Sequence, residues 1–202
     1  MRFAFACLLS AAFAALAALV AVGTLTGVDQ WAVEHLMPGA TFASEDSGVL
    51  GALVPLYGSH WGNAWSVAAN VVTLPAAFVI SLALVAWRSR ALAVLLVAGT
   101  AVETLCKTVL DRPALHDGAH HIAGFDSSFP SGHTLRTVIL AGAFARPWAA
   151  AWAAVSIVLL QLAGWHTPSD IAGGLLLGAL ALLGARGAAR ALRARGLLCG
   201  RA

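Results

Sequence analysis

Long apolar stretches separated by short polar segments set the pattern of the chain. An uncharged apolar run of about 20 residues is long enough to cross the hydrocarbon core of a bilayer as a helix. Pro75 falls inside one such run, and membrane helices tolerate the kink that a proline introduces. The pattern therefore predicts six transmembrane helices, at 3–27, 64–87, 91–110, 131–146, 147–165 and 168–186. A basic tail follows at 187–202.

The segment after the first predicted span differs from the spans in its polar content. Residues 29–36 place polar and apolar side chains on opposite faces at helical spacing. This spacing predicts a short amphipathic helix that lies at the membrane interface.

Composition agrees with a membrane-embedded chain. The 202 residues are 60% hydrophobic and only 10% charged, and the mean hydropathy is +0.84. These values exclude an average soluble domain and predict an all-α, polytopic membrane protein with a single domain. The net charge of +3 does not indicate nucleic-acid binding, because the arginines stand at the ends of apolar runs, where lipid headgroups account for them. Three cysteines, two of them in apolar runs, suggest neither a disulfide framework nor a zinc site.

The arginines also predict an orientation. With six spans, Arg2, Arg88, Arg90, Arg146 and the tail arginines fall on one side of the membrane, and the positive-inside rule makes that side cytoplasmic. We therefore expect a multi-pass plasma-membrane protein with both termini in the cytoplasm and its polar segments on the outer face.

One polar segment combines cations with a helix start. Ionisable side chains inside a membrane span are costly, so Lys107 marks a site or pairs with Glu103 four residues earlier. Lys107 and Arg112 precede the sequence Phe-Pro-Ser-Gly-His at 129–133, which opens the fourth span. The amides of Ser131 and Gly132 at this helix N-terminus, with two nearby cations, suggest an anion site.

A second polar segment opens the sixth span. His166 and Asp170 are four residues apart, so the carboxylate can bind one imidazole nitrogen and leave the other as a nucleophile or base. Taken alone, the pair equally fits an interfacial histidine beside an acid, and the first segment equally fits an ordinary helix start.

Together, and in this order, the lysine, Arg-Pro, Pro-Ser-Gly-His and His-x-x-x-Asp elements resemble the type 2 phosphatidic acid phosphatase (PAP2) family. The resemblance runs from about residue 107 to residue 170, and the six-span layout extends it. It implies a six-helix bundle without metal or cofactor. It also implies the roles of seven residues: His166 attacks phosphorus, Asp170 orients it, His133 protonates the leaving oxygen, and the phosphate is held by Lys107, Arg112, Ser131 and Gly132.

The chain departs from the family pattern at two phosphate-binding positions. Four residues instead of six separate Lys107 from Arg112, and Leu159 and Leu160 stand where the family has Ser-Arg. Arg136 lies three residues beyond His133 on the same helix face. We hypothesise that Arg112 and Arg136 together restore the cationic cradle, while snorkelling to headgroups is an alternative role for Arg136.

The resemblance predicts an enzyme that hydrolyses a lipid phosphomonoester or pyrophosphate from the outer face through a phosphohistidine. Candidate substrates are polyprenyl pyrophosphate, phosphatidic acid and phosphatidylglycerol phosphate, and the predicted partners are this lipid and the bilayer. Two alternatives stay open: a phosphotransferase with an acceptor other than water, and a non-catalytic protein that binds lipid phosphates. The sequence leaves the oligomeric state open. A polar loop precedes the fourth predicted span and contains His116, Asp117, His120, His121 and Asp126. A metal site here is a weaker hypothesis than solvated or substrate-contacting side chains.

Overall fold

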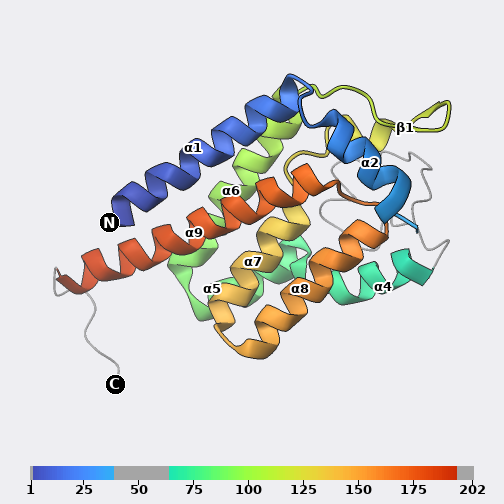
Figure 1. Cartoon of the computed structure of the whole chain (residues 1–202). Helices are drawn as coiled ribbons and strands as arrows, with labels where there is room; N and C mark the ends of the chain where they lie inside the picture. The colour runs from blue at the N-terminus through green and yellow to red at the C-terminus, as the bar shows by residue number, and fades with distance from the viewer. Residues whose placement is uncertain (1, 39–63, 195–202) are drawn as a thin grey trace.

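Helices dominate the chain in the computed structural model, which describes residues 2–38 and 64–194 (Figure 1). The α-helices are α1 (Arg2–Ala21), α2 (Thr26–Leu36), α4 (Ala64–Thr73), α5 (Phe78–Arg88), α6 (Arg90–Val109), α7 (Gly132–Phe144), α8 (Pro147–Leu162) and α9 (Pro168–Ala194). The connection from α6 to α7 contains an antiparallel hairpin of β1 (His116–Asp117) and β2 (His120–His121), followed by the short 3-10 helix η2 (Ala123–Phe125). The predicted all-α class is confirmed.

Four segments of the described chain are long and apolar enough to cross a membrane, at Phe3–Ala21, Ala64–Arg88, Arg90–Val109 and Pro168–Ala191. They correspond to four of the six predicted spans. The other two predicted spans, 131–146 and 147–165, form the 13-residue helix α7 and the 16-residue helix α8. At 1.5 Å per residue these helices are about 20 and 24 Å long, shorter than a hydrocarbon core of about 30 Å. The six-span arrangement is therefore not confirmed.

The predicted kink at Pro75 is present. The 3-10 helix η1 (Leu74–Ala76) separates α4 from α5, and the backbone leaves helical geometry at Ala77. A break of this kind frees backbone carbonyls from the helical hydrogen-bond ladder. The carbonyl of Ala76 accepts a hydrogen bond from Nε of Arg136 at 2.8 Å, so the kink provides one fixed contact for a buried arginine.

Helix α7 occupies the centre of the bundle, with α9, α8, α5 and α6 packed around it (Figure 1). Its buried leucine and isoleucine side chains form the main apolar core with residues of α5, α6 and α9. Close packing against α9 depends on Gly178, because a Cβ there would lie 2.7 Å from Cβ of Val138. This packing places the first turns of α7 and α9 side by side.

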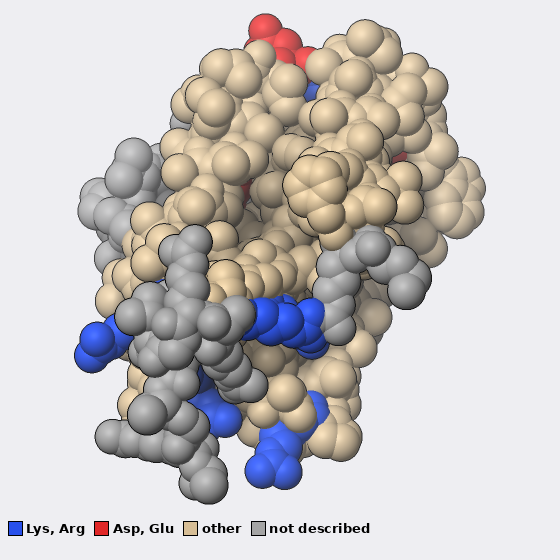
Figure 2. Space-filling model, turned by 90° about the vertical axis from the view of Figure 1, so that its left-hand side faces the viewer, with Lys and Arg blue, Asp and Glu red and all other residues tan. Residues whose placement is uncertain are grey.

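Five exposed arginines and the polar motif residues lie at opposite ends of the bundle. Arg88, Arg90, Arg146, Arg186 and Arg190 are exposed near the end of α5, the start of α6, the turn between α7 and α8, and the last part of α9. Figure 2 shows most of the visible Lys and Arg side chains in the lower part of this face and acidic side chains at its upper end. The first turns of α7 and α9 lie at the other end of these helices, away from the arginines.

Helix α2 confirms the predicted helix at 29–36, but its surroundings differ from the expectation. Asp29, Ala32 and Val33 are buried, and α2 contacts both β1 and α9. One face of α2 therefore packs on the protein, which the prediction of an interfacial helix did not include.

Candidate functional site

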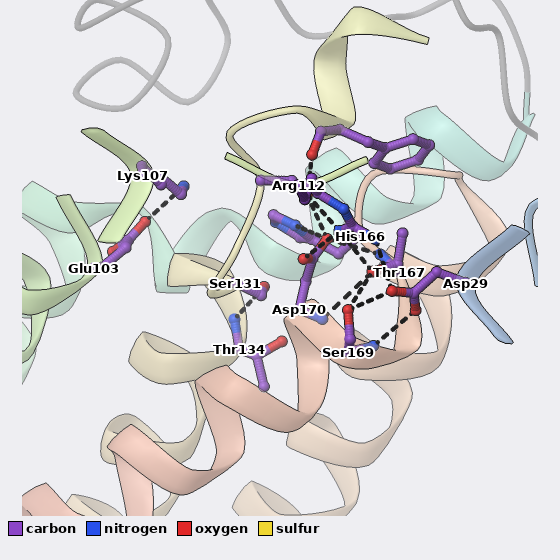
Figure 3. A network of polar contacts seen from close by, with 12 residues as sticks. Asp29, Glu103, Lys107, Arg112, Ser131, Thr134, His166, Thr167, Ser169 and Asp170 are labelled. Carbon is purple, nitrogen blue, oxygen red and sulfur yellow. Dashed lines mark hydrogen bonds and ion pairs between the residues drawn. The ribbon is translucent and has the colours of Figure 1, made fainter. Parts of the chain in front are cut away.

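The polar residues of both predicted motifs meet where α7 and α9 begin (Figure 3). The two helix starts are joined directly, because the backbone N–H of Ser131 donates to the carbonyl of Asp170 at 2.9 Å. Pro168 stands in the first turn of α9, where its missing N–H costs nothing and its fixed φ suits a helix start. The side chain of Ser131 caps α7 by accepting a hydrogen bond from the Thr134 amide at 3.2 Å.

Two histidines face each other at this junction. The ring centroids of His133 and His166 are 5.9 Å apart with 50° between their planes, and the Trp165 ring lies 5.8 Å from that of His133. His166 is buried, whereas His133 is partly exposed. These residues are 33 positions apart in the sequence and come from different helix starts. The structure therefore brings together the two histidines that the sequence motifs singled out.

Asp170 is fully buried and its carboxylate has several donors. Oδ2 accepts hydrogen bonds from the hydroxyl of Ser128 at 2.7 Å and from the amide of Thr167 at 3.0 Å. Oδ1 accepts from Nη1 of Arg112 at 3.1 Å. Buried carboxylates are tolerated when partners of this kind satisfy them. The position of Asp170 is therefore fixed from three parts of the chain.

The Asp170 carboxylate also faces His166. Its Oδ2 lies 3.8 Å from Nδ1 of His166, which is longer than a hydrogen bond, and within the described residues this nitrogen has no hydrogen-bond partner. The carboxylate therefore lies on the Nδ1 side of the ring, and Nε2 is the ring nitrogen that does not face it.

Arg112 is held between two buried carboxylates. Nη1 donates to Asp170, while Nη2 donates to Oδ2 of Asp29 at 2.6 Å. Only 3% of the Arg112 side chain is exposed. The guanidinium predicted to hold phosphate is thus engaged by Asp29 and Asp170 and neutralised by their charges. This arrangement of Asp29, Arg112 and Asp170 is called the acidic triad below.

A second charged group lies on the α6 side of the histidines. The carboxylate of Glu103 accepts from Nζ of Lys107 at 2.9 Å and from Nη1 of Arg136 at 3.1 Å. The pairing of Glu103 with Lys107 confirms the expectation from their spacing. Arg136 lies three residues after His133 on α7, so it is on the same helix face as this histidine. Glu103, Lys107 and Arg136 are called the basic triad below.

The predicted phosphate cradle is thus brought together only in part. Arg112 and Arg136 do not join in one cluster, since each binds a different carboxylate. The Ser131 amide already donates to Asp170, so Gly132 supplies the next amide at the start of α7. A Cβ on Gly132 would collide with the Glu103 carboxylate, which shows how closely that acid approaches the helix start.

Four contributors to the site were not singled out by the sequence pattern. They are Asp29, Ser128, Thr167 and Ser169, which all belong to the buried network around Asp170 and Arg112. For Asp29 a signal existed, because a carboxylate shares the buried helix face of Ala32 and Val33. Ser128 and Ser169 are ordinary loop and helix-start residues, and nothing in the pattern sets them apart.

The loop histidines lie on the hairpin, outside the histidine pair. The rings of His116 and His121 are 5.9 Å apart, and Nε2 of His121 lies 2.8 Å from Oδ1 of Asp126. Among the described residues no group of three or more His, Cys, Asp or Glu side chains has a geometry that could hold a metal ion.

Comparison of the chain with protein-family models, curated proteins and solved structures found no match. The site is therefore defined by its own residues. They form a pair of histidines at the junction of two helix starts, with a carboxylate behind one ring and cations beside the other.

Proposed function

We propose that the chain is an integral membrane phosphatase that hydrolyses a lipid phosphomonoester or pyrophosphate through a phosphohistidine on His166. The observation that supports the proposal most directly is the juxtaposition of His133 and His166, with Asp170 behind the His166 ring. Phosphoryl transfer needs an attacking group and a leaving-group acid on opposite sides of the phosphorus atom. Two neighbouring imidazoles, with ring centroids 5.9 Å apart, suit these two roles.

In this mechanism Nε2 of His166 attacks phosphorus, and the bond from phosphorus to the leaving oxygen breaks. The imidazolium of His133 gives its proton to that oxygen and becomes a neutral imidazole. Water then attacks the phosphohistidine, His133 takes up a proton from it, and phosphate leaves while His166 is regenerated. The Asp170 carboxylate, 3.8 Å from Nδ1 of His166, stabilises the positive charge that develops on the ring.

The negative charge on the transferred group needs cationic and amide donors. Because Arg112 is engaged by two carboxylates, we assign this part to Lys107, Arg136 and the amides at the start of α7. Lys107 is the most accessible of these cations, with 31% of its side chain exposed. It can exchange its contact with Glu103 for a phosphate oxygen by rotating its flexible side chain.

The membrane setting favours a lipid substrate. Four described segments are long and apolar enough to cross a bilayer, and the histidine pair lies at one end of them. A substrate whose tail stays in the bilayer presents its phosphate at this depth. We place that end on the outer face of a plasma membrane, with both termini in the cytoplasm, because the exposed arginines lie at the other end.

The test is phosphate release by the protein purified in detergent, using polyprenyl pyrophosphate, phosphatidic acid and phosphatidylglycerol phosphate. We expect His166→Ala to lower turnover at least about a thousand-fold, as removal of a nucleophile does. His121→Ala on the exposed hairpin is the matched control and should retain wild-type turnover. An alkali-stable, acid-labile phosphoprotein should form in the wild type and be absent from His166→Ala.

The other outcomes exclude the proposal in distinguishable ways. Turnover that persists in His166→Ala contradicts the assigned nucleophile. Product formation only with an added alcohol acceptor identifies a phosphotransferase. No turnover with any lipid, combined with measurable lipid-phosphate binding, identifies a non-catalytic binding protein.

A further inference from the structure

Helix α2 contributes a buried charge to the site from outside the two motifs. Asp29 is only 1% exposed, and it lies 83 residues before its partner Arg112 and 140 before its partner Ser169. A buried carboxylate is costly unless nearby donors satisfy it. Its partners on two other parts of the chain therefore indicate a specific role for this side chain.

Asp29 binds the start of α9. Its Oδ1 accepts a hydrogen bond from the Ser169 amide at 3.1 Å, and its Oδ2 accepts one from the Ser169 hydroxyl at 2.5 Å. The first amides of a helix have no partner within the helix, and a carboxylate is the favoured group to satisfy them. Such a cap normally comes from the residue before the helix. Here part of the capping is supplied by another helix.

Asp29 also sets the orientation of Arg112. It holds Nη2 at 2.6 Å, which leaves Nη1 for Asp170 at 3.1 Å. Without Asp29, both Nη groups of Arg112 would be free to bind the Asp170 carboxylate as a two-pronged pair. That arrangement would turn the carboxylate toward Arg112 and away from His166.

We propose that Asp29 is a positioning residue for the histidine pair: by binding both the start of α9 and Arg112, it keeps the Asp170 carboxylate directed at Nδ1 of His166. The expected effect on catalysis rests on the proposed function. The orientation of the Asp170 carboxylate does not depend on turnover. Helix α2, which lies outside both motifs, thereby contributes a residue to the site.

The activity test compares Asp29→Asn with Glu34→Gln, which removes an exposed acid from the same helix. Asparagine keeps the size of the side chain and removes its charge. For Asp29→Asn we expect kcat to fall about 10- to 100-fold with KM changed less than about threefold, as for the loss of one charge-assisted hydrogen bond. Glu34→Gln should match the wild type, and Asp29→Glu should recover part of kcat.

A second measurement does not depend on turnover. In protein labelled with ¹⁵N-histidine, the side-chain nitrogen resonances of His166 are identified by their loss in His166→Ala. We expect Asp29→Asn to move these resonances and Glu34→Gln to leave them unchanged. If Asp29→Asn does not fold, Ser169→Ala serves in its place, since it removes one of the donors to Asp29 and should move the same resonances less.

The two measurements separate the failure of this inference from the failure of the proposed function. An active wild type with unchanged kcat in Asp29→Asn overturns the inference and leaves the phosphatase proposal standing. If the wild type shows no turnover, the phosphatase proposal fails and the histidine resonances alone decide. Unchanged His166 resonances in the folded Asp29→Asn protein then overturn the inference.

Discussion

The acidic and basic triads are built from the same kinds of residue in opposite proportion. In the acidic triad one arginine lies between two carboxylates, and in the basic triad one carboxylate lies between a lysine and an arginine. Counting ionised side chains, the first group has one excess negative charge and the second has one excess positive charge. The group in which cations outnumber carboxylates therefore lies on the α6 side of the histidine pair.

The two groups also differ in what they connect. The acidic triad joins α2, the loop after α6 and the start of α9, whereas the basic triad joins neighbouring turns of α6 to α7. The acidic triad is almost entirely buried, while Lys107 is partly exposed. Similar ion pairs thus differ in what they provide: the acidic triad binds backbone amides of the site through its carboxylates, and the basic triad leaves one cation, Lys107, partly exposed.

The largest effect should come from removing the cation of the acidic triad. Arg112→Gln leaves Asp29 and Asp170 buried without their countercharge, and breaking a buried pair in this way costs about 3–5 kcal/mol. We expect a large fall in the midpoint temperature of thermal unfolding. Unfolding is monitored by tryptophan fluorescence of the protein in detergent. Arg146→Gln, which replaces an exposed arginine, is the control. Equal midpoints for the two variants would show that the acidic triad has no structural role.

A smaller effect on stability, with a gain in binding, should follow from Glu103→Gln. The amide oxygen still accepts one hydrogen bond, so the loss of stability should be about 1.5–3 kcal/mol, the value for a hydrogen bond to a charged group. Lys107 and Arg136 would then lack their carboxylate, and inorganic phosphate should bind more tightly in calorimetry. Asp117→Asn, at an exposed hairpin acid, should leave phosphate affinity unchanged. Weaker phosphate binding in Glu103→Gln would contradict the assigned excess of positive charge.

The smallest effect concerns the space between the basic triad and α7. In Gly132→Ala the new methyl group meets the Glu103 carboxylate, which lies at the end of a flexible side chain and can turn aside. We expect a loss of about 1 kcal/mol, at the low end for overpacking. The control is Gly27→Ala at the start of α2, where a Cβ has open space, and there we expect a gain of about 0.4–1 kcal/mol. The same unfolding assay checks both, and a stabilised Gly132→Ala would contradict the close approach of Glu103.

The helices were predictable because apolar length and local signals agree. Pro147 and Pro168 open α8 and α9 as expected, and Pro75 interrupts the helix between residues 64 and 88. The number of spans was less predictable, because a short apolar helix buried in a bundle and a membrane-crossing helix have the same composition. Helix α7 is apolar because it packs against four neighbours, and its 13 residues fall short of a span.

The site was predictable where its parts are local in sequence. The spacing of Glu103 and Lys107 indicated their ion pair, which is confirmed at 2.9 Å. The partners of Arg112 and Arg136 come from distant segments, and a cation in a sequence does not reveal which carboxylate will bind it. The phosphate-binding and catalytic roles of the motif residues stay predictions.

The helix lengths described above have a consequence for the lipid around the protein. A bilayer adjusts to short embedded helices by thinning locally, at a cost of fractions of a kcal/mol per Å. Beside α8, which is about 24 Å long and exposes Trp148, Val155 and Val158, headgroups would sink toward the middle of the membrane. Under the proposed function, this thinning would lower the lipid phosphate to the depth of the histidines, and thin membranes would suit the protein better than thick ones.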